Sequence, residues 1–298
     1  MTTVPYLDAF LNDVSGSHHT RRAYRRDLAD FAAWFRDTTG EVPAPGLVTR
    51  ADLRDWRDFM ARRYRASTVN RKLAGVSRWL RWCHEQGHRT APPPGVSPLR
   101  QQILGPRGLS RAEEARLVRE AERAVLAAER ISEAATFRAV RNLALVVLML
   151  HAGLRVGEVI RVRLDDIERQ GRKGWLRIQG KGRKERRVPL NKTARRVLER
   201  WLAQRTARRV SAETLFVGQR GQALDPASVR RIVADLARRA GVQATPHTLR
   251  HTFAHRLVEA GVGLEKIAAL MGHASLNTTR RYVEPGERDL ERAVEKLA

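Results

Sequence analysis

The sequence of 298 residues has one cysteine, Cys83, and only 6% aromatic residues. A single cysteine cannot form an intrachain disulfide, and it excludes a cysteine-based zinc site. The longest apolar run, LALVVLML at residues 143–150, is too short to span a bilayer. The N-terminus lacks the basic and apolar regions of a secretory signal. We therefore expect a reduced, cytoplasmic compartment and no membrane partner.

Acidic side chains are also scarce in comparison with basic ones. The chain has 57 lysine and arginine residues against 32 aspartate and glutamate residues, which gives a net charge of +25 and a pI near 11.5. Such an excess of positive charge predicts a polyanionic partner, of which DNA is the obvious example. The length is sufficient for two domains, each with a sizeable core.

A segment rich in proline and glycine divides the chain at residues 90–108. Proline removes the backbone N–H that a helix needs, and glycine favours turns, so this segment predicts an interdomain linker. Residues 1–89 then form one domain and residues 109–298 form the other.

Residues 1–89 show the apolar periodicity of helices at 20–35, 49–64 and 67–87, and predict an all-helical domain. Basic residues lie on the opposite faces of these helices. A charged helix face is often only solvated, but in a chain this basic we expect some of these residues to contact DNA phosphates. The candidates are Arg21, Arg22, Arg25, Arg71 and Lys72.

The second domain predicts helices with one small antiparallel sheet. Residues 175–179 and 186–190 alternate as two strands around a basic turn, and residues 159–167 indicate a further short strand. Ser110 and Glu113 form a capping box that begins a helix, and another helix covers about 135–151. Asp225-Pro226 and Thr245-Pro246 have the cap-plus-proline pattern of helix starts. The predicted fold is therefore mainly α.

Three histidines, His247, His251 and His255, repeat at helical spacing and raise the question of a metal site. On one straight helix the outer two lie about 12 Å apart, too far for a single tetrahedral ion. His247 and Arg250 share the first turn instead, where the positive end of the helix favours an anion.

Two further stretches admit a structural or a functional interpretation. Arg155 follows a glycine break and precedes Glu158 by three residues, so the two form either a surface ion pair or an arginine held toward a cleft. Lys181 lies between two glycines in the predicted hairpin, with Arg183 and Lys184 close behind. That turn is either a solvated basic loop that contacts DNA, or a loop whose glycines bring Lys181 close to a ligand.

Together these residues supply every role for cutting a DNA strand without metal or ATP. A tyrosine can form a phosphoester, and two arginines can hold the phosphate oxygens in the five-coordinate state. Arginine does not give up a proton, so a lysine is needed for the leaving 5′-hydroxyl and a histidine for the tyrosine. The candidates are Arg155, Lys181, His247, Arg250, His273 and Tyr282.

The stretches GLRVGE, GKGRKERRVPL, HTLRHTFAHRL and LMGHASLNTTRRY occur in that order between residues 153 and 282. In this respect the chain resembles the tyrosine recombinases of the phage integrase family, particularly the compact Xer-type members. With the helical N-terminal region, which resembles the core-binding domain, the resemblance covers nearly the whole chain.

The resemblance implies a role for each matching position. Arg155 and Arg250 match the arginines that hold the scissile phosphate, and Glu158 the acid that supports the first arginine. Lys181 matches the general acid and His247 the histidine that assists the nucleophile. His273 matches a position that contacts the phosphate, and Tyr282 the nucleophile that forms a 3′-phosphotyrosyl link.

The resemblance also implies a site-specific DNA recombinase that needs no cofactor and acts in the nucleoid. Its partners would be double-stranded DNA with paired recombination sites and other subunits, as a homo-tetramer or as a hetero-tetramer with a related recombinase. Exchange would proceed through a Holliday junction. A C-terminal helix at about 286–298 would dock on a neighbouring subunit, or its apolar stripe would pack within the same subunit. We expect no additional arm-binding domain before the first helix. A type IB topoisomerase and a DNA-binding regulator with an integrase-like fold are the alternatives.

Overall fold

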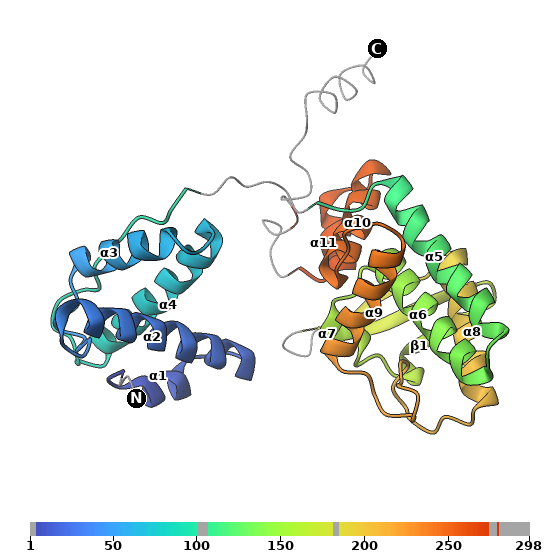
Figure 1. Ribbon diagram of the computed structural model, residues 1–298, viewed down its shortest axis with the longest axis horizontal. Coiled ribbons are helices and arrows are strands. Elements are labelled where there is room, and N and C mark those ends of the chain that lie inside the picture. The colour runs from blue at the N-terminus through green and yellow to red at the C-terminus, as the bar shows by residue number, and fades with distance from the viewer. Residues whose placement is uncertain (1–3, 101–106, 181–184, 274–278, 280–298) are drawn as a thin grey trace, which may run out of the picture. The chain divides into compact units, whose positions relative to one another are not determined.

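The structure is a computed structural model that describes residues 4–100, 107–180, 185–273 and Thr279. It divides into two compact units, Met1–Ile103 and Leu104–Ala298, and the boundary falls within the segment predicted as a linker (Figure 1). Several predicted features lie outside the described residues. These are Lys181, Arg183, Lys184, Tyr282 and the helix at 286–298.

The N-terminal unit is helical, as its periodicity predicted. Its described residues form α1 (Leu7–Asp13), α2 (His18–Thr39), α3 (Arg50–Ala61) and α4 (Ala66–Glu85). The core is aromatic: Phe31 and Trp56 meet edge to face with ring centroids 4.9 Å apart, and Trp79 is fully buried. The short α1 has no counterpart among the predicted helices, since seven residues hold too few turns to show a period.

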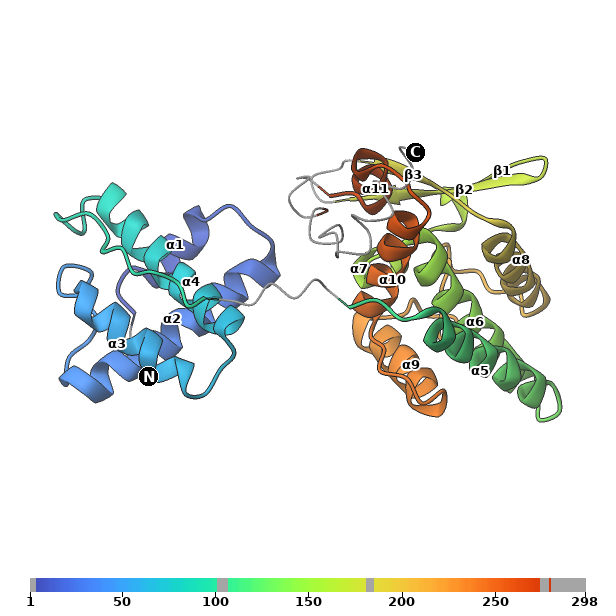
Figure 2. The same ribbon diagram turned by 90° about the horizontal axis from the view of Figure 1, so that it is seen from above.

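The C-terminal unit is built around one apolar helix. Its described helices are α5 (Arg111–Glu129), α6 (Glu133–Ala152), α7 (Val156–Val159), α8 (Lys192–Ala207), α9 (Pro226–Arg239), α10 (Pro246–Glu259) and α11 (Leu264–Met271). By length and composition α6 could cross a membrane. It is instead the central core helix, in contact with α5, α8 and α10 (Figure 2). Its burial on most sides explains the apolar run.

A three-stranded antiparallel sheet lies beside these helices (Figure 2), with the order β1 (Ile167–Gln170), β2 (Lys173–Gln179) and β3 (Glu185–Pro189). The pairing of β2 with β3 confirms the predicted hairpin, and Leu176 lies opposite Val188 in the buried layer. The mainly α fold with a small antiparallel sheet is therefore confirmed.

The strand predicted over 159–167 is wrong. The segment contains the end of α7 and a single 3₁₀ turn, Leu164–Asp166, before β1 begins. Two carboxylates override the alternating pattern, because Glu158 accepts the backbone N–H of Arg155 and Asp166 accepts that of Arg163. Capping of this kind favours helical turns over extended backbone.

A tight turn after α6 positions the residues that follow. Gly153 has φ +60°, and a Cβ built on it would lie 2.3 Å from Cδ1 of Phe253 on α10. Only glycine suits both the backbone angle and the close approach. The turn brings Arg155, the residue that precedes α7, toward α10 and the end of α11.

Candidate active site

A buried carboxylate lies at the centre of the predicted site. The Glu158 side chain is 3% exposed. Its Oε1 accepts hydrogen bonds from Nη1 of Arg155 at 2.8 Å and Nη1 of Arg186 at 2.9 Å. Its Oε2 accepts the backbone N–H of Arg155 and Nη2 of Arg186, each at 2.8 Å. The ion pair of Arg155 with Glu158 is therefore part of a buried network rather than an isolated surface contact.

The network keeps Glu158 ionised. Burial alone would raise its pKa, but the hydrogen bonds from Arg186 and Arg155 outweigh the desolvation and lower the pKa to about 2. At neutral pH the carboxylate thus offsets part of the positive charge of the arginines around it.

The second predicted arginine lies beside the same carboxylate. Arg250, on the first turns of α10, is buried, and its Nη1 lies 3.9 Å from Oε2 of Glu158. Its guanidinium donates to the backbone carbonyls of Gly153 and Met271. The structure therefore brings Arg155 and Arg250 together from segments 95 positions apart in the sequence, with Arg155 the more exposed of the two.

The end of α11 accepts hydrogen bonds from all three arginines. Arg186 donates from Nε to the carbonyl of Leu270 at 2.9 Å, Arg250 donates to Met271, and Arg155 donates from Nη2 to Gly272 at 3.0 Å. Carbonyls at the C-terminal end of a helix lack partners within the helix and carry partial negative charge. The arginines therefore tie this helix end, and His273 just beyond it, to the site.

Arg186 was not among the site residues predicted from the sequence. Its signal was the two-residue alternation of β3, in which Arg186 shares the inward face with Val188. An arginine at an inward strand position requires a buried partner, and Glu158 is that partner.

The histidines near the arginines are uncharged at neutral pH. The pKa of His247 is lowered by the partial desolvation of its ring and by the charges of Arg250 and Arg155. Burial and the neighbouring charges lower the pKa of His251 to about 3 and that of His273 to about 4. A neutral imidazole can accept a proton, so His247 is in the protonation state that a base requires.

Two of these histidines lie on α10, and the third follows α11. His247 and His251 lie with their ring centroids 3.9 Å apart on α10, and His251 is buried. His273 follows α11 and shares a hydrogen bond of 2.8 Å between its Nδ1 and Oγ1 of Thr279. Within the described segments, no group of three or more histidine, cysteine or acidic side chains is placed to hold a metal ion.

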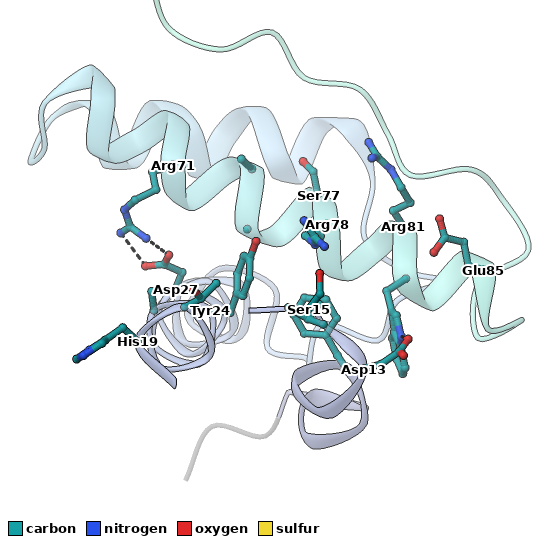
Figure 3. Close-up of a pocket in the computed structure, with 17 residues that line it drawn as sticks. Asp13, Ser15, His19, Tyr24, Asp27, Arg71, Ser77, Arg78, Arg81 and Glu85 are labelled. Carbon is teal, nitrogen blue, oxygen red and sulfur yellow. Dashed lines mark hydrogen bonds and ion pairs between the residues drawn. The ribbon is translucent and has the colours of Figure 1, made fainter. Parts of the chain in front are cut away.

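A second candidate site is a groove in the N-terminal unit, with a volume of about 1030 Å³. It is lined by parts of α1, α2 and α4 (Figure 3). One predicted contact residue, Arg71, lines it, together with Arg78 and Arg81, two exposed arginines that the sequence analysis did not name. All three come from α4 at spacings of seven and three residues, which places them along one side of the helix.

Lys72 requires a correction. Its side chain is only 6% exposed, and its ammonium group pairs with Asp27 and Asp30 on α2. Lys72 holds α4 to α2, and its side chain is too buried to contact DNA. Arg71 also pairs with Asp27 but is 45% exposed. Arg21, Arg22 and Arg25 are exposed on α2, and Arg25 pairs with Asp8 at 2.8 Å.

Comparisons with known proteins agree with this geometry. Residues 119–288 match the phage integrase family and residues 5–87 match its N-terminal SAM-like domain. The chain is 35% identical over 276 residues to tyrosine recombinase XerC of Rhodospirillum centenum, covering 90% of this chain and 78% of the relative. It is 32% identical over 290 residues to XerC of Thermodesulfovibrio yellowstonii, covering 93% and 90%.

A solved structure shows the same fold. The XerH site-specific recombinase bound to a palindromic difH substrate superposes with a TM-score of 0.78 at 22% identity, covering 92% of this chain and 79% of that one. The chain therefore belongs to the phage integrase family, the tyrosine recombinases, which are enzymes that cleave and rejoin DNA.

Proposed function

We propose that this chain is a site-specific recombinase that cleaves DNA at paired recombination sites through a 3′-phosphotyrosyl link to Tyr282. The observation that carries the proposal is the convergence of Arg155 and Arg250 on the buried carboxylate of Glu158, with His247 and His273 nearby. The two arginines come from separate segments, and together they form a compact positive site for a phosphate.

The arginines suit the charge change of the reaction. A phosphodiester carries one negative charge and gains a second in the five-coordinate state that forms when an ionised tyrosine attacks. Arg155 is exposed enough to bind the non-bridging oxygens, while Arg250 adds positive charge from a buried position. Fixed charges in place before the reaction stabilise such a state without reorganisation.

His247 and Lys181 are proposed to carry the two proton transfers of the reaction. In the proposed reaction the Tyr282 hydroxyl attacks phosphorus and its proton passes to His247. The bond to the 5′-oxygen breaks, and that oxygen takes a proton from Lys181. Ionising a tyrosine of pKa about 10 at pH 7 costs roughly 4 kcal/mol, and His247 with the arginines offsets that cost. Rejoining reverses the steps with a 5′-hydroxyl from the partner site.

DNA binding belongs to both units in this proposal. The N-terminal unit is the core-binding domain, and its groove with Arg71, Arg78 and Arg81 faces the duplex. Arg183 and Lys184, which follow Lys181 in the sequence, contact the DNA backbone. The active assembly is a homo-tetramer, or a hetero-tetramer with a related recombinase, joined by the C-terminal helix at 286–298.

The test is capture of a covalent complex. A duplex recovered from a randomised pool by binding selection is nicked on one strand, so that the short fragment released by cleavage diffuses away and rejoining is blocked. The wild-type chain should accumulate a covalent adduct, seen as a shifted band on a denaturing gel. Tyr282→Phe should give none, and Tyr64→Phe, at an exposed tyrosine of the N-terminal unit, should match the wild type. A wild-type chain without adduct, or an adduct with Tyr282→Phe, contradicts the proposal.

A further inference from the structure

We propose that Arg186 is a positioning residue that sets the orientation of Arg155 by saturating Glu158. The inference rests on the proposed function and adds to it a residue with a defined task. Arg186 does not act on DNA in this account. It acts through the carboxylate and through the end of α11.

Glu158 can accept only a limited number of hydrogen bonds. An ionised carboxylate has about four lone-pair positions, two on each oxygen. Arg186 takes one on each oxygen, the backbone N–H of Arg155 takes the second on Oε2, and Nη1 of Arg155 takes the second on Oε1. Four donors therefore fill four positions.

Saturation limits how Arg155 can bind. Arginine and carboxylate pair most strongly through two parallel hydrogen bonds, and such a pair would turn both Nη atoms of Arg155 toward Glu158. With Arg186 already in the bidentate position, Arg155 reaches Glu158 through Nη1 only, and its Nη2 points to the carbonyl of Gly272. Glu158 and the carbonyl of Gly272 thereby hold Arg155 in one orientation, and part of its guanidinium remains available to a phosphate.

Exposure separates the two arginines. The Arg186 side chain is 11% exposed, against 42% for Arg155, and each of its three nitrogens has an acceptor within the protein. Arg155 therefore presents the surface that meets the ligand, and Arg186 supports it from within.

Arg186 also joins three parts of the site. It lies on β3, shortly after Lys181 in the sequence, and its Nε donates to the carbonyl of Leu270 at the end of α11. The close packing depends on Gly272, since a Cβ there would lie 2.9 Å from Nη1 of Arg186. The side chain of Arg186 thus connects β3, the pair of Arg155 and Glu158, and the end of α11 that leads to His273.

The first experiment measures cleavage and binding separately, on the nicked duplex described above. Arg186→Met should slow single-turnover cleavage by roughly 10- to 100-fold, the range typical when a residue that orients a metal ligand is removed, while the Kd for DNA stays unchanged. Arg186→Lys keeps the positive charge but loses the bidentate hydrogen bonds to Glu158, so it should recover only part of the rate. Arg205 is the matched control, because it is also buried and donates to the carbonyls of Ala212, Thr214 and Leu215 away from this cluster. Arg205→Met should lower the Tm without slowing cleavage by the folded protein.

The second experiment asks whether Arg186 acts through Arg155. Adding Arg186→Met to Arg155→Ala should slow cleavage no further, because the residue being positioned is already gone. Independent, multiplicative effects of the two substitutions would overturn the inference, as would a wild-type rate for Arg186→Met in a wild-type chain that forms the adduct. Absence of any wild-type adduct would overturn the proposed function itself, so the two failures are distinguishable. If Arg186→Met does not fold, the same comparison is made with Arg186→Lys.

Discussion

At the scale of single residues, Glu158 shows how a buried charge can be both costly and useful. Removing a carboxylate from water opposes ionisation, and only several well-placed donors offset that cost. Glu158 has four donors, which come from Arg155 and Arg186. The charge is therefore retained, and it fixes the arginine that is proposed to bind the phosphate.

Because of Glu158, the free energy of unfolding should depend on pH in the acid range. Its folded pKa of about 2 lies below the unfolded value of about 4.3, so its contribution is present above the unfolded pKa and is lost as pH falls toward 2. The difference corresponds to about 3 kcal/mol at neutral pH. Urea unfolding of wild type and Glu158→Gln should therefore show a gap in unfolding free energy that is constant from pH 7 to 5 and narrows toward pH 3. A gap that does not change with pH contradicts the ionised assignment.

Lys181 should prove necessary for the leaving group alone. Lys181→Ala should slow cleavage severely, because the 5′-oxygen departs poorly without a proton. A substrate with sulfur at the bridging 5′-position leaves as a thiolate and needs no proton, so it should largely restore the rate of Lys181→Ala. The same substrate should not rescue Arg155→Ala, which lacks charge stabilisation instead. No rescue of Lys181→Ala removes this lysine from the role of acid.

At the scale of elements, α4 presents two kinds of basic residue within two turns. Lys72 faces α2 and pairs with Asp27 and Asp30, whereas Arg78 is exposed in the groove. Their helix positions differ by six residues, which rotates one well away from the other. Charge on a helix therefore does not define a DNA-binding face until the neighbouring helix is known.

These two residues should respond differently to removal. Lys72→Met should lower the unfolding free energy by roughly 1–3 kcal/mol, since the buried carboxylate of Asp27 loses a donor, and leave the salt dependence of DNA binding unchanged. Arg78→Ala should do the reverse: an unchanged Tm, and a plot of log K against log salt whose slope is smaller by about 1 for the lost phosphate contact. Equal effects of both substitutions on the salt slope would contradict the assignment.

The elements predictable from the sequence are those with local signals. Apolar periodicity and caps such as Ser110, Asp225 and Thr245 located long helices to within a few residues. The strand predicted over 159–167 was wrong because the caps at Arg155 and Arg163 compete with the alternating pattern. Arg186 and Lys72 pair with Glu158 and Asp27, which are distant in the sequence, so no local signal identifies these partners, although the alternation of β3 places Arg186 on the inward face.

The site was predictable only in part for the same reason. Arg155, Glu158, His247, Arg250 and His273 were identified individually, and the structure places them in one region. The hydrogen bond from Arg155 to the carbonyl of Gly272 spans 117 positions, and the bond from Arg186 to the carbonyl of Leu270 spans 84, and no spacing rule expresses such contacts. The positions of Lys181 and Tyr282 lie outside the described residues, and their roles remain predictions.

At the scale of the whole molecule, the charge of +25 is suited to binding a long polyanion. Charge alone does not distinguish a recombinase from a type IB topoisomerase or from a DNA-binding regulator. The proposed recombinase should exchange strands only between two copies of its selected site, and four-way junctions should appear as intermediates. On a plasmid that carries two such sites, we expect deletion of the intervening segment. Relaxation of supercoiled plasmid without any site, and without deletion, would favour the topoisomerase.

The most direct test of the central claim is to locate the DNA–protein bond in the trapped adduct. The adduct is digested with protease and nuclease, and mass spectrometry identifies the peptide that carries the nucleotide. We expect a peptide containing Tyr282, joined through its phenolic oxygen to the 3′-phosphate of the cleaved strand. A nucleotide on any other residue, or a link to a 5′-phosphate, would contradict the claim.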